Sequence, residues 1–114
     1  MEYLQQKLDR PYLSTSASAD KYMQIANYFN SLGNGFKDQG RLDDAIACYY
    51  RAVEHNPDDA VAYNNLGNAY KFKGDLNRAG FYYQKALQAN PQYADAHYNL
   101  GILYAEHGRY RDAV

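Results

Sequence analysis

The sequence predicts an all-α protein, a solenoid of antiparallel helix pairs stacked one on the next. The main reason is an internal repeat, because shifting the 114-residue chain by 34 residues brings many identical or similar residues into register. Glycine and proline also recur where helices of this length should end. The composition agrees, because 14 tyrosines, 4 phenylalanines and no tryptophan suit thin layers in which a ring is buried and its hydroxyl stays near water.

The repeat is defined by pairs and single residues that recur in three copies. Its strongest element is a Leu-Gly pair, which is followed by an aromatic residue, a glycine and an alanine. The copies are Leu32-Gly33, Leu66-Gly67 and Leu100-Gly101; Phe36, Tyr70 and Tyr104; Gly40, Gly74 and Gly108; and Ala45, Ala79 and Ala113. Two copies also share Tyr49 with Tyr83, Ala52 with Ala86, and Asn56-Pro57 with Asn90-Pro91.

The boundaries of the helices follow from their end signals. Gly40, Gly74 and Gly108 should end each first helix in the left-handed conformation, and Asp43 and Asn77 should cap each second helix. Pro57 and Pro91 prevent the second helices from continuing. The predicted helices are 26–39, 43–55, 60–73, 76–89 and 94–107.

Small residues mark the places where paired helices cross. Gly33, Gly67 and Gly101 should lie at these crossings, with Ala45 and Ala79 facing them, because closely approaching backbones leave no room for larger side chains. Gly80 stands inside a helix, where glycine costs about 1 kcal/mol relative to alanine. An unusually close neighbour is the alternative reason for that glycine.

This set of positions resembles the tetratricopeptide repeat (TPR) family from residue 26 to residue 114. The resemblance implies a right-handed superhelix whose first helices line a concave face. It divides the chain into an N-terminal extension (1–25), a first repeat (26–59), a second repeat (60–93) and a partial third repeat (94–114), whose first helix acts as a cap. The incomplete third repeat suggests a fragment of a longer array or a module completed by self-association.

The N-terminal extension does not follow the repeat. Tyr3, Leu4 and Leu8 form a short apolar stripe that predicts a short helix ending before Pro11. A Ser-rich loop is expected at residues 14–18, with the first long helix starting near Ala19. This extension could contact its own first helix, the concave groove or another copy of the chain.

Asparagine dominates the positions that the resemblance places on the concave face. Its amide carries a donor and an acceptor, so it can bond a peptide backbone regardless of the ligand's side chains. Some of these residues could instead bridge adjacent helices. The candidate peptide-binding residues are Asn30, Asn34, Asn64, Asn65, Asn68, Lys71, Tyr98 and Asn99.

Two known groove types offer a comparison. An asparagine ladder of this kind resembles the superhelix of O-linked N-acetylglucosamine transferase. Co-chaperone TPR domains instead clamp a C-terminal carboxylate, and Asn34 and Asn65 match the asparagines of that clamp. Its basic positions are occupied here by Asn30, Asp95 and Asn99, so binding of an acidic chaperone tail is disfavoured.

Composition and spacing argue against other functions. A net charge of -1 provides no field for nucleic acid or an anionic membrane. Cys48 is the only cysteine, so the chain cannot form an internal disulfide, which favours an intracellular, cytoplasmic location. We interpret Cys48 as a small packing residue. His55, His97 and His107 lack metal-ligand spacing, and no phosphate-binding loop is present. We therefore expect no enzyme activity, no cofactor and no metal.

The sequence thus predicts a scaffold that binds an extended segment of a protein partner in its concave groove. Two alternatives remain open at this stage. One is a structural module that self-assembles into a homo-oligomer through its exposed C-terminal helix and N-terminal extension. The other is the substrate-recruiting part of a larger enzyme, such as a glycosyltransferase.

Overall fold

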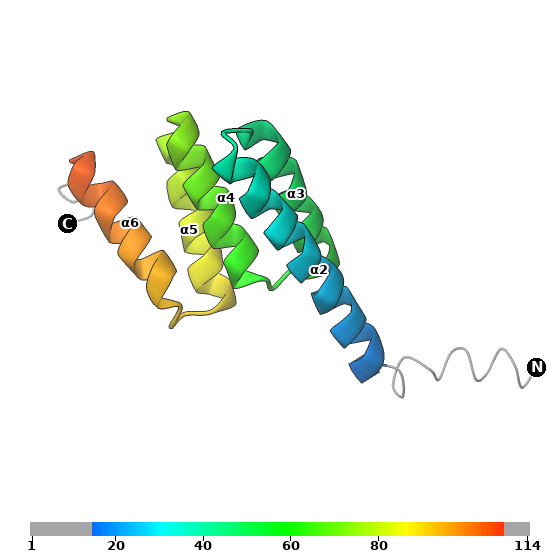
Figure 1. Cartoon of the computed structure of the whole chain (residues 1–114). Coiled ribbons are helices and arrows are strands. Elements are labelled where there is room, and N and C mark those ends of the chain that lie inside the picture. The colour runs from blue at the N-terminus through cyan, green and yellow to red at the C-terminus, as the bar shows by residue number, and fades with distance from the viewer. Residues whose placement is uncertain (1–14, 109–114) are drawn as a thin grey trace, which may run out of the picture.

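The computed structural model describes residues 15–108, which form five helices and no strand. The helices are α2 (Thr15–Asp38), α3 (Leu42–His55), α4 (Ala60–Lys73), α5 (Leu76–Ala89) and α6 (Ala94–Glu106). They follow one another in a single stack, with α2 and α6 at its two ends (Figure 1). The all-α repeat fold predicted from the sequence is confirmed. The predicted short helix near Tyr3 and the repeat position at Ala113 lie outside the described residues.

The stack is built from antiparallel pairs. Helix α2 packs on α3 and α4 packs on α5, while contacts of α3 with α4 and of α5 with α6 join successive pairs. The first helices also contact one another, α2 with α4 and α4 with α6, whereas the backbones of α3 and α5 stay apart. The first helices therefore form the inner, concave row, as the resemblance implied.

The glycine and proline signals end the helices as predicted. Gly40, Gly74 and Gly108 have φ values of 78°, 85° and 68°, in the left-handed region that a glycine adopts without penalty. Helices α3 and α5 end two residues before Pro57 and Pro91.

The predicted N-caps of the second helices were wrong. Helix α3 begins at Leu42 and α5 at Leu76, so Asp43 and Asn77 lie inside the first turn. The side chain of Asp75 caps α5 by accepting a hydrogen bond from the Arg78 N–H, whereas Arg41 precedes α3 without a side-chain cap. Helix α3 thus begins one residue before its predicted start, whereas α5 begins where it was predicted and only its cap residue differs.

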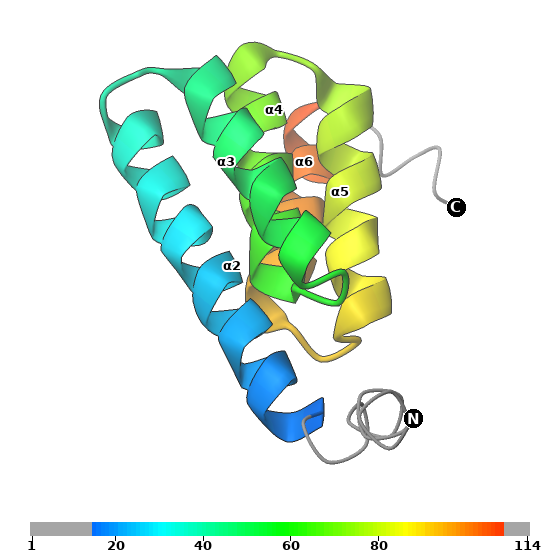
Figure 2. The same ribbon diagram turned by 90° about the vertical axis from the view of Figure 1, so that its right-hand side faces the viewer.

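The start of the first long helix also differs from the prediction. Helix α2 begins at Thr15 instead of near Ala19, so residues 15–18 are helical and do not form a loop. Neither glycine nor proline occurs between Pro11 and Gly33, and alternating alanines favour the helix over the serine turns. The long helix projects beyond the end of α3 at its N-terminal end (Figure 2).

Tyrosines fill the contact between the first two pairs. The hydroxyl of Tyr50 lies 2.8 Å from that of Tyr70 and 2.9 Å from that of Tyr82. The ring of Tyr82 stacks on Tyr70 with centroids 5.7 Å apart, next to the buried core residue Ile46. Burial, and then hydrogen bonds to the two neighbouring hydroxyls, raises the pKa of Tyr50 far above its usual value. The tyrosines thus bury their rings while bonding their hydroxyls to one another.

Candidate functional site: the concave face

The asparagines of the concave face are mostly engaged within the protein. Asn30 is 6% exposed, and its Nδ2 donates to the carboxylate of Asp59 at 2.9 Å. Asn65 is 9% exposed, and its Nδ2 lies 3.5 Å from Oδ1 of Asn30. These contacts join α2 to α4, so both side chains bridge adjacent helices, which was the second interpretation offered by the sequence.

The same bridge recurs one repeat later. Nδ2 of Asn99 on α6 donates to Oδ1 of Asn64 on α4 at 3.0 Å. Asn64 is 5% exposed, whereas Asn99 is half-buried. The two residues of each bridge are 35 positions apart in the sequence, which is one more than the repeat length. Each asparagine therefore bonds the residue one position beyond its equivalent in the next first helix.

Asn34 and Asn68 have a different arrangement. Each accepts a hydrogen bond from a buried tyrosine of its own repeat, Asn34 from Tyr49 at 2.5 Å and Asn68 from Tyr83 at 2.6 Å. Asn34 is exposed and Asn68 is half-buried. Each oxygen thus accepts one hydrogen bond from within the repeat, and no described residue accepts one from either amide N–H.

The two other predicted residues have opposite surroundings. Nζ of Lys71 on α4 lies 3.1 Å from the Glu106 carboxylate on α6, an ion pair that links the two helices. Tyr98 is 70% exposed at the start of α6. The exposed ring is available to a ligand, whereas the charge of Lys71 is largely balanced.

Exposed apolar side chains on this face were missing from the sequence-based site. Phe72 is 71% exposed and Val61 is 45% exposed, both on α4. The sequence carried a signal for them, because an apolar residue at a groove-facing helix position breaks the polar pattern of its neighbours. The sequence-based site did not include them, because asparagines are more numerous on this face.

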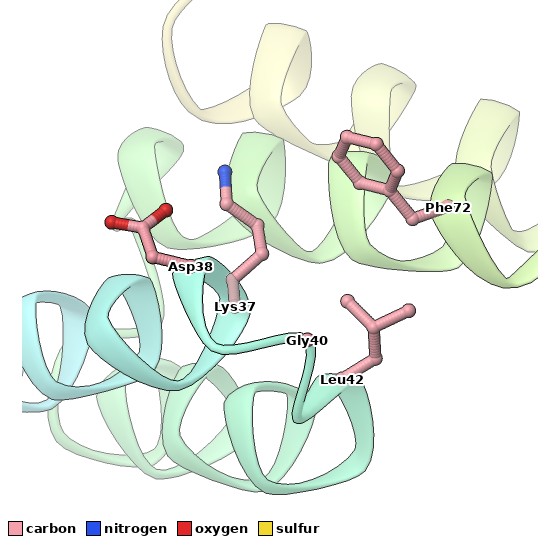
Figure 3. A pocket seen from close by; sticks show the side chains of 5 residues that line it. All are labelled: Lys37, Asp38, Gly40, Leu42 and Phe72. Atoms are coloured by element: carbon pink, nitrogen blue, oxygen red, sulfur yellow. The ribbon is translucent and has the colours of Figure 1, made fainter.

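A pocket of about 330 Å³ lies beside Phe72 at the ends of α2 and α4. Leu42 and Phe72 provide apolar walls, and Lys37, Asp38 and Gly40 complete the lining. The side chains of Leu42 and Phe72 point towards the same space, with Lys37 and Asp38 from α2 on the other side (Figure 3). An apolar side chain of a ligand would fit here, between walls supplied by three helices.

The surroundings of Cys48 and of the histidines can also be described. Cys48 is buried, and burial followed by the nearby Asp44 carboxylate raises the pKa of its thiol, which disfavours the reactive thiolate. Within residues 15–108, no three His, Cys, Asp or Glu side chains gather as a metal site would require. In the same range no helix has both the length and the apolar character needed to cross a membrane.

The close contacts at the helix crossings involve tyrosines more than alanines. A Cβ built on Gly33 would lie 2.6 Å from Cε1 of Tyr49, and one on Gly67 would lie 2.5 Å from Cδ1 of Tyr83. Ala79 approaches the Gly67 position with its backbone oxygen at 3.1 Å, and no atom of residues 15–108 lies within 4 Å of a Cβ at Gly101. The predicted facing of glycine by alanine was thus incomplete, because the rings that bond Asn34 and Asn68 occupy the space.

Several solved structures share this fold. The first TPR domain of Spaghetti (RPAP3), solved with the HSP90 peptide SRMEEVD, has a TM-score of 0.75 and 25% identity over 80% of this chain and 74% of that one. The second TPR domain of the same protein, with the same peptide, has a TM-score of 0.75 and 26% identity over 86% and 89%. MamA has a TM-score of 0.69 and 27% identity over 92% of this chain and 66% of its own.

Family models match most of the sequence. None of the curated proteins compared with it matches significantly. Three models do match: one described as TPR repeat at residues 33–74, and two described as tetratricopeptide repeat at residues 60–93 and 82–114. Together with the helix pairs and the left-handed glycines, these matches show that the chain belongs to the tetratricopeptide repeat family.

Proposed function

We propose that the concave face of this TPR module binds an extended segment of a protein partner. The observation that carries the proposal is the pocket beside Phe72, since a large ring that is 71% exposed on the inner row of helices is costly unless something covers it. The two RPAP3 domains that share the fold bind a peptide, which supports the same general role here. We place the module inside the cell, as its single cysteine suggests.

In this proposal the ligand is anchored at both ends of the groove. Phe72 and Leu42 would take an apolar side chain at one end, and Val61 and Tyr98 would contact the ligand at the other. Between them, the N–H groups of Asn34 and Asn68 would bond the ligand backbone. We expect micromolar affinity, equivalent to about -8 kcal/mol.

The test uses a matched pair of variants with exposed phenylalanines. Peptides selected from a random display library would be measured by fluorescence anisotropy against the wild type, Phe72→Ala and Phe81→Ala. Phe81 is 54% exposed but lies on α5, outside the concave row. We expect Phe72→Ala to weaken binding by about tenfold and Phe81→Ala to leave it unchanged. Equal affinities for all three proteins, or no selected peptide, would contradict the proposal.

A second candidate, self-association, is favoured by a separate surface. A pocket of about 280 Å³ lies between α5 and α6 and is lined in part by Phe81, Leu103 and Tyr104. Among the described residues no helix covers it, so a second copy could pack there and form a homo-oligomer. Sedimentation at high concentration tests this idea, and a strict monomer would exclude it.

A further inference from the structure

Asp59 is a buried carboxylate directly behind the concave face. It is 7% exposed and stands at the N-terminus of α4. One oxygen accepts the Ala62 N–H at 3.1 Å, and the other accepts Nδ2 of Asn30 at 2.9 Å. Because an ionised carboxylate can only accept hydrogen bonds, Asp59 dictates which end of the Asn30 amide points towards it.

The direction of the Asn30 amide determines that of Asn65. With its N–H directed at Asp59, Asn30 turns Oδ1 towards α4, where Nδ2 of Asn65 lies 3.5 Å from it. Among the described residues no group donates a hydrogen bond to Oδ1 of Asn65. In the same residues no fully buried side-chain N or O atom lacks a partner, so this oxygen is at least partly accessible, and we take it to face the groove.

We infer that Asp59 sets the hydrogen-bonding polarity of the groove and that the groove therefore selects an internal peptide segment over a C-terminal carboxylate. This inference rests on the proposed function. The oxygen of Asn65 accepts hydrogen bonds, so it suits a backbone N–H of an extended chain. A carboxylate at the same place would meet a lone pair on Asn65 and the negative charge of Asp59 behind it.

The next repeat has the same amide pair without a carboxylate behind it, so the role of Asp59 concerns the first pair alone. Asn99 donates to Asn64 in the same direction as Asn65 donates to Asn30. The position of Asp59 is taken there by Tyr93, so no equivalent carboxylate fixes the second amide pair. Asp95 adds an exposed negative charge one helical turn before Asn99 on α6, and none of the described ion pairs includes Asp59 or Asp95.

The substitution Asp59→Asn isolates this role. Asparagine caps a helix as well as aspartate, so the new side chain can still accept the Ala62 N–H. Its amide N–H then faces Asn30, and Asn30 must turn its oxygen towards it. Asn30 in turn donates to Asn65, whose N–H becomes the group presented to the groove. Removal of one negative charge thus reverses the donor and acceptor roles of both Asn30 and Asn65.

The polarity can be read without any ligand. In the wild type, NMR should show the Asn65 side-chain NH₂ protected from solvent exchange and close to Asn30. In Asp59→Asn the same NH₂ should exchange rapidly with solvent, while an unchanged melting curve would show that the fold is intact. Equal protection in both proteins would overturn the inference.

Binding provides the second readout. A library-selected peptide, acetylated and amidated at its ends, would be compared with versions carrying Gln or Glu at each position in turn, at 0.5 M salt to screen long-range charge. At the position next to Asn65 we expect Glu to bind the wild type about tenfold more weakly than Gln, and Asp59→Asn to remove most of that difference. The peptide SRMEEVD, which ends in a free carboxylate, should not saturate the wild type.

The outcomes separate the two proposals. If no peptide binds the wild type, the peptide-binding function itself is refuted. If peptides bind and Phe72→Ala weakens them, but the Gln and Glu versions differ equally in the wild type and in Asp59→Asn, then only the role of Asp59 is refuted.

Discussion

The ring of Tyr83 occupies the space in which residue 67 would carry a side chain. A Cβ on Gly67 would lie 2.5 Å from both Cδ1 and Cε1 of that ring. The ring cannot easily move, because Tyr83 is 1% exposed and its hydroxyl donates to Asn68. One contact thus connects the repeat glycine, the core tyrosine and an asparagine of the concave face.

Replacing this glycine should destabilise the protein. We expect Gly67→Ala to lower the free energy of unfolding by about 1–3 kcal/mol, because the methyl group overpacks the crossing of α4 and α5. Gly101→Ala is the matched control, since it occupies the same repeat position and no described residue comes within 4 Å of its Cβ. Urea unfolding measures both, and a Gly67→Ala variant as stable as the Gly101→Ala variant would disprove this explanation of the recurring glycine.

Gly80 should behave in the opposite way. A Cβ at this position would lie 3.5 Å from Cδ2 of Leu103, an ordinary contact, so within the described part of the chain Gly80 has no unusually close neighbour. We expect Gly80→Ala to stabilise the protein by up to about 1 kcal/mol through helix propensity. A thermal melt compares it with Gly35→Ala, a helical glycine in open space. A lower melting temperature for Gly80→Ala alone would contradict the prediction.

Alkaline pH should weaken the fold through Tyr49 and Tyr83. Burial raises the pKa of each to about 12 from an ordinary value of 10.0, with Asp38 adding to the effect on Tyr49. Because the folded pKa exceeds the unfolded one, this stabilisation is complete below pH 10 and is lost as the pH rises through about 12.

The corresponding experiment measures urea midpoints between pH 8 and pH 11.5. The double variant Tyr49→Phe and Tyr83→Phe should lose about 1 kcal/mol per hydroxyl at pH 8, because two hydrogen bonds to Asn34 and Asn68 disappear. It should also lose less stability than the wild type on going to pH 11.5. An identical pH dependence in both proteins would show that other groups are responsible.

Asn65→Ala should cost stability as well as any ligand contact. Its removal leaves the oxygen of Asn30 without its partner in a site that is 6% exposed, so we expect a loss of about 1–3 kcal/mol. Asn27→Ala, at an exposed position of α2, should change stability by less than about 0.5 kcal/mol. Equal melting temperatures would mean that the bridge between Asn30 and Asn65 contributes little.

Most of the fold could be predicted because each signal for a helix end or a helix crossing occurs in two or three copies of the repeat. The left-handed glycines, the prolines and the Leu-Gly pairs are local signals, and they located α4 and α5 to the residue. The start of α2 was less predictable, because serines favour both caps and turns and only the absence of a helix breaker decides between them.

The site was harder to predict because it depends on pairs of residues far apart in the sequence. The periodicity placed Asn30 and Asn65 on neighbouring helices, but nothing in the sequence showed that they bond each other, or that Asp59 is buried behind them. Nor could the sequence show that Leu42 and Phe72 share a pocket, because Leu42 lies on α3, which belongs to the outer row of helices. Whether the module belongs to a larger enzyme is a prediction that the length of the parent gene would test.

The most direct test of peptide binding is an NMR titration of ¹⁵N-labelled protein with a library-selected peptide. The account predicts saturable shift changes on the inner row of helices, centred on Asn65, Asn68 and Phe72. Changes confined to α5 and its neighbourhood, around Phe81 and Gln84, would contradict it, because they would place the ligand on the outer surface of the stack.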